Sequence, residues 1–232
     1  MNFPSRDALE KGEIIVEGRL VEASNATLFG RIHYGDELFN VIYKPIQGER
    51  PLWDFPEGTL AVREYAAYLV SEMSGLKCVP PTALRDGPFG IGSVQFWIET
   101  GDDSDLIEWA QSDDPRLRRL VLFDAIINNT DRKFGHILLH ESGALFGCDH
   151  GVTFHEEEKL RTVLWQFADL PLSADEVEFV KRLELHLEAS EIPELLAERE
   201  VAALKSRIHR LLKESRFPLP SEEWPAIPWP PV

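Results

Sequence analysis

Hydrophobic positions in the first hundred residues occur in short runs rich in β-branched and aromatic side chains, and turn residues separate these runs. This pattern predicts strands. Four such runs are present: residues 14–21, 28–32, 39–43 and 92–98. Between the third and the fourth the spacing becomes helical, and Thr59 is expected to cap this helix and Gly75 to end it. The pattern therefore predicts a small sheet with one helix.

Helical spacing continues through most of the second half of the chain. Asp114, followed by Pro115, is expected to cap a helix that ends near Asn128. Two apolar runs at 137–139 and 144–146 flank a turn and predict a hairpin. Two further helices are predicted: residues 177–188, which follow a capping box at Ser173 and Glu176, and residues 199–214.

The last segment, residues 217–232, contains six prolines and two tryptophans, Trp224 and Trp229. A segment with this composition does not form a helix. Two alternatives stay open for it. It packs its tryptophans onto the preceding residues, which we favour, or it binds a partner.

The charge balance argues against several classes of function. Lys and Arg number 24 against 40 Asp and Glu, so the formal charge is −16. We therefore expect no binding to nucleic acid or to anionic membranes, because both depend on basic residues. Asp124 interrupts the longest apolar run, so we expect no integral membrane association. With no signal-peptide pattern, and with Cys78 and Cys148 in apolar contexts, we expect a cytoplasmic protein with reduced cysteines.

Four charged residues stand out, although each is a weak signal alone. Lys44 ends an apolar strand and Glu64 borders the apolar face of the helix. Each position is also typical of an ordinary solvent-exposed residue with no catalytic role. Asp131 and Asp149 lie in predicted loops, where Asp commonly forms turns. Phosphoryl transfer from ATP needs a cation on the phosphates, an anion that holds this cation, a carboxylate near the acceptor hydroxyl and a carboxylate on the metal. The four residues occur in the order in which a kinase uses these groups.

Four segments around these residues resemble the phosphatidylinositol 3-/4-kinases, and the type II 4-kinases above all. Residues 41–45 and 63–80 resemble the lysine strand and following helix of those enzymes. Residues 123–132 (FDAIINNTDR) resemble their catalytic loop, and residues 148–151 (CDHG) their metal-binding loop. The resemblance spans residues 20–171. The chain is also similar to a group of uncharacterised actinobacterial proteins of this superfamily and, more distantly, to HipA-type protein kinases.

The resemblance implies an α+β protein with a two-lobed, protein-kinase-like or phosphatidylinositol 3-/4-kinase-like fold. Residues 1–99 would form a small N-terminal lobe, a β-sheet with one helix. Residues 100–216 would form a mainly helical C-terminal lobe with the catalytic and metal loops. ATP would lie between the lobes, and residues 217–232 would form a tail.

The resemblance also implies a role for each site residue. Lys44 would contact the α- and β-phosphates of ATP and pair with Glu64. Asp131 would be the catalytic aspartate, Arg132 would brace the catalytic loop, and Asp149 would bind Mg²⁺ or Mn²⁺. Two groups of residues would complete the nucleotide site: Ser24, Asn25 and Thr27 in place of a Gly-rich phosphate loop, and Phe96, Trp97 and Ile98 against the adenine.

One position departs from the kinase pattern. Five residues after the catalytic aspartate, kinases carry an Asn that binds the second metal ion, and this chain has His136. Imidazole suits Mg²⁺ less well than a carbonyl oxygen does and favours softer ions. The alternatives are a preference for manganese, a site with one metal ion, weak catalysis, or a His136 that points elsewhere.

The acceptor is predicted from charge. The stretch that would hold an anionic lipid headgroup reads HEEEKLR (residues 155–161), and its glutamates would repel such a group. We therefore expect an ATP-dependent phosphotransferase that acts on a protein hydroxyl or a soluble small molecule. The alternatives are an ATP-binding pseudokinase or scaffold module, a phosphoinositide kinase, and an enzyme that transfers AMP instead of phosphate.

Overall fold

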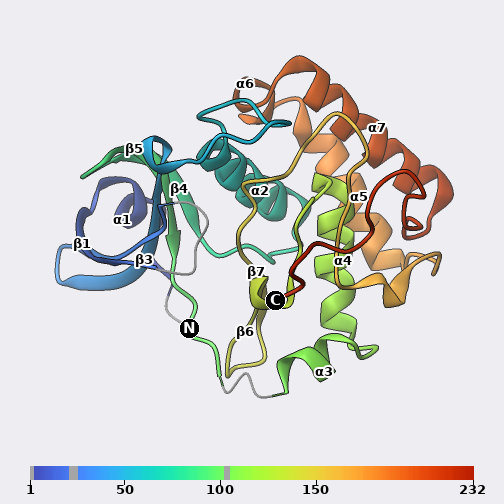
Figure 1. Ribbon diagram of the computed structural model, residues 1–232, viewed down its shortest axis with the longest axis horizontal. Coiled ribbons are helices and arrows are strands. Elements are labelled where there is room, and N and C mark those ends of the chain that lie inside the picture. The colour runs from blue at the N-terminus through green and yellow to red at the C-terminus, as the bar shows by residue number, and fades with distance from the viewer. Residues whose placement is uncertain (1–2, 21–25, 102–104) are drawn as a thin grey trace.

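The computed structural model describes residues 3–20, 26–101 and 105–232. A five-stranded antiparallel sheet forms its N-terminal part, in the spatial order β1-β2-β3-β5-β4. The strands are β1 (Glu13–Arg19), β2 (Leu28–Tyr34), β3 (Glu37–Pro45), β4 (Thr82–Gly87) and β5 (Gly90–Phe96). Helix α1 (Arg6–Lys11) packs on the sheet, and α2 (Leu60–Ser74) lies between the sheet and the helical part of the molecule (Figure 1).

Strand β3 has a different environment on each of its two faces. Val41 and Tyr43 are fully buried in a small core with Leu9 of α1 and Ile32 of β2. Because successive side chains of a strand point to opposite faces, Lys44 points away from this core. It reaches the side of the sheet on which α2 lies.

The C-terminal part is mainly helical and surrounds one larger core. Its helices are α3 (Leu106–Ala110), α4 (Pro115–Ile127), α5 (Ala174–Leu187), α6 (Ile192–Leu195) and α7 (Glu198–Glu214). A short hairpin, β6 (Ile137–Leu139) and β7 (Leu145–Gly147), follows α4. The described residues also form three short 3₁₀ helices: η1 (Ile46–Gly48), η2 (Phe134–His136) and η3 (Trp165–Phe167). The molecule is thus α+β, as predicted.

Several local predictions are confirmed. Asp114 accepts a hydrogen bond from the N–H of Arg116 and caps α4. Ser173 and Glu176 form the predicted capping box at the start of α5. Gly75 ends α2 in the left-handed region, with φ of +82°, which glycine adopts without the steric cost of a Cβ atom. The predicted hairpin is β6 and β7.

Thr59 stands at the N-cap position of α2, as predicted. Thr59 makes no side-chain capping hydrogen bond there. The carboxylate of Glu49 instead accepts from the N–H groups of Leu60 (3.1 Å) and Ala61 (2.8 Å). A carboxylate satisfies the free N–H groups of a helix start and is favoured by their partial positive charge. Since Glu49 comes from the preceding loop, the local capping pattern did not reveal it.

The tail packs back along the C-terminal part, and Figure 1 shows it returning from the end of α7 to the middle of the molecule. This is the alternative that we favoured, but the two tryptophans differ. Trp224 is half-buried, whereas Trp229 is 89% exposed. Within the described residues, no helix combines the length and the apolar character needed to cross a bilayer.

Candidate active site

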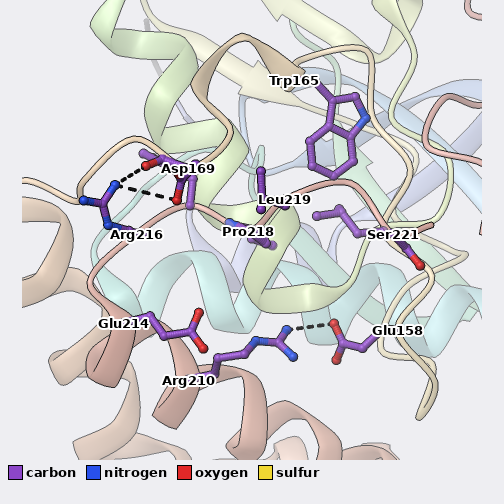
Figure 2. Close-up of a pocket in the computed structure, with 12 residues that line it drawn as sticks. Glu158, Trp165, Asp169, Arg210, Glu214, Arg216, Pro218, Leu219 and Ser221 are labelled. Carbon is purple, nitrogen blue, oxygen red and sulfur yellow. Dashed lines mark hydrogen bonds and ion pairs between the residues drawn. The ribbon is translucent and has the colours of Figure 1, made fainter. Parts of the chain in front are cut away.

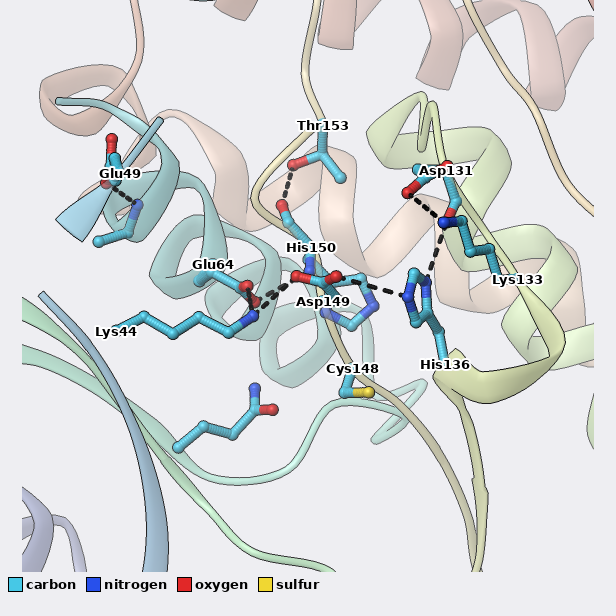
Figure 3. Close-up of polar contacts among 12 residues, drawn as sticks. Lys44, Glu49, Glu64, Asp131, Lys133, His136, Cys148, Asp149, His150 and Thr153 are labelled. Carbon is cyan, nitrogen blue, oxygen red and sulfur yellow. Dashed lines mark hydrogen bonds and ion pairs between the residues drawn. The ribbon is translucent and has the colours of Figure 1, made fainter. Parts of the chain in front are cut away.

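The ammonium group of Lys44 lies between two carboxylates (Figure 3). It donates hydrogen bonds to Glu64 Oε1 and to Asp149 Oδ1, the latter at 2.8 Å. Burial disfavours the charged form of Lys44, but the negative charges of Asp149 and Glu64 outweigh this effect and raise its pKa. The charge of Lys44 in turn lowers the pKa of Asp149. Strand β3, helix α2 and the loop after β7 thus bring a cation and two carboxylates together.

The two carboxylates differ in their exposure. Glu64 is 3% exposed, and its second oxygen accepts the backbone N–H of His150 at 2.9 Å. The side chain of Asp149 is 52% exposed. Glu64 is therefore held by the protein on both oxygens, whereas Asp149 is accessible to a ligand from solvent.

Asp131 lies at the end of the segment that follows α4. Its backbone N–H donates to Asn129 Oδ1 at 3.0 Å. The carboxylate is 3.7 Å from Lys133 Nζ, and 29% of the side chain is exposed. Burial raises the pKa of Asp131, and the charge of Lys133 opposes this shift. Lys133 was not predicted from the sequence, although its spacing of two from Asp131 in an extended segment places both side chains on one side.

Arg132 is fully buried and connects four segments. Its guanidinium forms a two-pronged ion pair with Asp124 of α4, at 2.9 and 2.8 Å. It also donates to the carbonyls of His136 (3.1 Å) and Cys148 (3.0 Å) and to His150 Nε2 (2.7 Å). With no exposed surface, Arg132 touches the loops that carry Asp131 and Asp149 rather than a ligand. These are the contacts of a positioning residue.

Asp124 is one of two buried acidic partners that the sequence analysis missed. It entered only as an interruption of an apolar run, yet it is 1% exposed and also accepts from Asn129 Nδ2 at 2.9 Å. The second is Glu200 of α7, which pairs with the buried Arg63 of α2 at 2.5 Å. A lone charge in an apolar helical stripe was the available signal for Asp124, because a buried charge needs a partner.

Replacement of Asp124 by Asn is expected to destabilise the protein strongly. The change leaves the buried charge of Arg132 without its carboxylate, and breaking a buried ion pair in this way costs about 3–5 kcal/mol of unfolding free energy. Urea denaturation measures it. Glu17→Gln is the control, because its ion pair with Arg31 is partly exposed and should contribute less than about 1 kcal/mol. Equal losses in the two variants would contradict the bracing role.

His136 points toward Asp149 (Figure 3). Its Nδ1 is 2.9 Å from the carbonyl oxygen of Asp131. A carbonyl only accepts, so Nδ1 carries the proton and Nε2 has the free lone pair. Nε2 is 3.4 Å from Asp149 Oδ2. Burial lowers the pKa of His136 to about 4, so the ring is neutral at pH 7 and two acceptors face each other.

This donor set fits a divalent cation. Two hydrogen-bond acceptors that face each other need a cation or a donor between them. A neutral imidazole nitrogen and a carboxylate oxygen are both common metal ligands. Within the described part of the chain, no group of three or more His, Cys, Asp or Glu side chains forms a metal cluster. An ion held by Asp149 and His136 would therefore take its remaining ligands from phosphate and water, as magnesium does in ATP-using enzymes.

Ser24, Asn25 and Thr27 were expected to take the place of a Gly-rich phosphate loop. Ser24 and Asn25 lie outside the described residues. Thr27 is only 7% exposed, and its carbonyl accepts from Leu20 N–H at 2.9 Å. Thr27 is packed directly before β2, and its contact with the phosphates stays a prediction.

Residues 96–98 connect the sheet to the helical part and were expected to contact the adenine. Some of their backbone groups are already hydrogen-bonded within the protein. The N–H groups of Phe96 and Trp97 already donate to backbone carbonyls, at 2.8 and 2.9 Å. Phe96 pairs directly with Val41, so its ring lies on the face of the sheet opposite Lys44. Phe96 therefore does not face the site. Ile98 is the first of these residues whose backbone has no such bond within the described chain.

The acidic stretch at residues 155–161 is not a bare negative patch. Each glutamate has a basic partner: Glu156 pairs with Arg199 (3.0 Å), Glu157 with Lys159 (3.4 Å) and Glu158 with Arg210 (2.8 Å). The repulsion predicted from the sequence is therefore weakened. Arg199 and Arg210 lie on α7, so the stretch itself gave no sign of them.

No model of a known protein family matches this chain, but curated proteins and solved structures are similar to it. Phosphatidylinositol 4-kinase gamma 2 of Arabidopsis thaliana is 27% identical over 162 residues, which cover 55% of the chain and 30% of that protein. The structure of the proinflammatory kinase CtkA of Helicobacter pylori is similar to this one, with a TM-score of 0.50 and 14% sequence identity. The match covers 90% of this chain and 94% of the CtkA chain. The Golgi casein kinase has a TM-score of 0.49 at 12% identity, over 89% and 72% of the two chains.

The likeness to CtkA shows a kinase-like fold, as predicted. Protein Rv2133c of Mycobacterium tuberculosis is 40% identical over 261 aligned positions, which cover 96% of this chain and 93% of that protein. Identity at this level across nearly the whole of both chains shows common descent. The chain belongs to the family of Rv2133c.

Proposed function

We propose that the protein is an ATP-dependent phosphotransferase that transfers the γ-phosphoryl group of ATP to a hydroxyl of a protein or of a soluble small molecule. The observation that carries the proposal is the meeting of Lys44, Glu64 and Asp149 at one point, from three separate segments. The kinase-like fold supports it. In such folds a lysine on the phosphates and a carboxylate on the metal belong to the transfer site.

Lys44 would bind phosphate oxygens of ATP. Glu64 is buried and fixed by His150 N–H, so it would keep the ammonium in place while the ligand changes. Asp149 would release Lys44 to the phosphates and, with His136, hold the metal ion. That ion would neutralise charge on the phosphates. The ion pair between Lys44 and Asp149 is thus the contact that ATP binding would replace.

Asp131 would orient the acceptor hydroxyl and take its proton. Its raised pKa makes it a better proton acceptor than an ordinary aspartate. Lys133, which lies 3.7 Å from this carboxylate, would place a positive charge near the transferred group. Arg132 and Asp124 would hold the loop that carries both residues.

One observation favours a second candidate, a phosphoinositide kinase. The chain is 27% identical to part of a plant protein named as a phosphatidylinositol 4-kinase. The paired glutamates at 156–158 also remove part of the charge argument against a lipid. The formal charge of −16 still favours a soluble acceptor, because an anionic membrane repels such a protein.

The test is a transfer assay with radiolabelled γ-phosphate ATP and either Mn²⁺ or Mg²⁺. Parallel reactions contain casein, phosphatidylinositol vesicles or the protein alone. Label on casein or on the protein itself supports the proposal, and label on the lipid alone supports the second candidate. No label on any acceptor would contradict both.

The metal preference should depend on His136. With His136→Asn, we expect the ratio of the rate with Mn²⁺ to the rate with Mg²⁺ to fall by about tenfold, because an amide oxygen is a harder ligand than imidazole. The same assay measures it. His140→Asn is the matched control, since His140 lies on the hairpin and bonds Ser142. An unchanged ratio in His136→Asn would show that His136 does not bind the metal.

A further inference from the structure

Residues 224–232, here called the C-terminal strap, lie beside the catalytic loop (Figure 1). The strap is held through its backbone carbonyls, as an extended peptide is held by a receptor. Three donors bind it: Phe134 N–H donates to Pro231 O (2.9 Å), and Thr162 N–H and Trp165 Nε1–H both donate to Ala226 O (3.0 and 2.8 Å).

All three donors come after Asp131 along the chain. Phe134 follows Asp131 by three residues. Arg132, the next residue after Asp131, forms a parallel backbone bridge with Thr162. The strap is therefore bonded to two segments that adjoin the loop that carries Asp131.

Trp224 anchors the other end of the strap. Its ring lies 4.8 Å from Lys159 Nζ and 5.6 Å from the guanidinium carbon of Arg161. Arg161 Nε donates to the carbonyl of Thr130, the residue before Asp131, at 2.5 Å. A second ring, that of Trp53, lies 4.8 Å from the same ammonium. The anchor thus consists of cation–π contacts on residues joined to the catalytic loop.

The strap is weakly held elsewhere. Trp229 is 89% exposed and Ile227 is 55% exposed. The Nε1–H of Trp224 is buried without a hydrogen-bond partner among the described residues, which disfavours this position. The chain that leads into the strap borders a cavity of about 590 Å³, which Leu219 lines together with Trp165 and Arg210 (Figure 2). Among residues 224–232 only Pro228 is buried, so few contacts hold the strap apart from its anchor and its three hydrogen bonds.

The strap also lacks any group that could accept a phosphoryl group. Its sequence, WPAIPWPPV, contains no Ser, Thr or Tyr. It therefore lies against segments that adjoin the catalytic loop without being a substrate itself. An acceptor peptide that binds where the strap binds, but carries a hydroxyl, would need the same three N–H donors.

We propose that the strap occupies the acceptor surface in cis, and that the acceptor is an extended protein segment of the same kind. Such a segment would be rich in proline, carry an aromatic side chain for Lys159 and Arg161, and present a Ser or Thr to Asp131. This inference rests on the proposed function and selects a protein acceptor within it. The strap must leave before the acceptor binds. The apparent affinity for the acceptor is therefore the intrinsic affinity multiplied by the fraction of molecules in which the strap is detached.

The probe is a fluorescent synthetic peptide of residues 222–232, and its binding to the full-length protein is measured by anisotropy without ATP. Trp224→Ala weakens the strap, so this variant should bind the peptide about 5 to 30 times more tightly than the unaltered protein does. Trp229→Ala is the matched control, because Trp229 is exposed, and it should bind like the unaltered protein. Equal binding by all three proteins, or none by any of them, would overturn the inference.

Two further measurements keep the outcomes separate. Trp224→Leu, which retains apolar bulk but not the cation–π contacts, repeats the test if Trp224→Ala lowers the melting temperature. A peptide that carries Ala226→Ser is then offered with labelled ATP, and the Trp224 variant should phosphorylate it faster than the unaltered protein does. Tighter peptide binding without any phosphate transfer would reject the proposed function alone. Transfer to other acceptors with no effect of Trp224 on peptide binding would reject the strap inference alone.

Discussion

Asp131→Asn should abolish phosphoryl transfer and leave ATP binding intact. A positioned general base contributes about 10²- to 10⁴-fold to the rate, so the loss is expected in that range. Asn has the same shape, and the backbone contacts of Asp131 to Asn129 and His136 do not use the carboxylate. The fold and the nucleotide site should therefore be unchanged. Label transfer from ATP measures the rate, and calorimetry measures ATP binding.

The control for this variant is Asp169→Asn. Asp169 pairs with Arg216 at 3.6 Å, and its side chain is 63% exposed. The same chemical change there should alter the rate by less than twofold, about the effect of a surface substitution of 0.5 kcal/mol or less. If Asp131→Asn retained the full rate, Asp131 could not be the base, and the mechanism would need another proton acceptor.

Asp149→Asn should remove the metal-dependent part of ATP binding as well as transfer. The change takes away the charged oxygen that faces His136 Nε2, and Lys44 keeps Glu64 as its partner. We expect ATP affinity with Mn²⁺ to fall by about 10- to 100-fold, the range seen when the surroundings of a bound metal are altered. Calorimetric titration with and without metal measures this fall.

The two aspartate variants separate the two roles. Asp131→Asn should lose transfer and keep metal-dependent ATP binding, whereas Asp149→Asn should lose both. Because the Asp149 side chain is half exposed, its replacement should have little effect on the melting temperature. If Asp149→Asn bound ATP and metal like the unaltered protein, Asp149 would not be a metal ligand.

The sequence predicted those parts of the structure that depend on neighbouring residues. The cap at Asp114 and the capping box at Ser173 and Glu176 were found because each is complete within four residues. The α+β class followed from the change in hydrophobic period. Helix α1 was missed because six residues are too few to show a helical period.

Lys44 and Glu64 could be named as a pair because their order along the chain, and the segments around them, resemble those of kinases. Their contact joins β3 to α2, as the resemblance implied. The surroundings of the site were not predictable in this way. Arg63 meets Glu200 across 137 residues, and Glu49 caps a helix from a loop. Such partners are set by tertiary packing, which leaves no local pattern.

Residues 156–159 show why the acceptor was not predictable from the charges of the sequence. The three glutamates at 156–158 are negative in the sequence, but each is paired in the structure. Lys159, which follows them, is 3% exposed and bonds Asp54 at 3.0 Å. A surface charge therefore could not be inferred from this stretch alone, because burial and pairing decide which charges face a ligand.

Mass spectrometry of the intact protein after incubation with ATP and Mn²⁺ or Mg²⁺, with and without casein, shows whether the protein transfers a phosphoryl group. We expect the protein or casein to gain the mass of a phosphoryl group, and the gain to disappear in Asp131→Asn. A gain of the mass of AMP would instead show nucleotide transfer. ATP binding with no gain in mass on any acceptor would show a nucleotide-binding module, and either result would contradict the phosphotransferase.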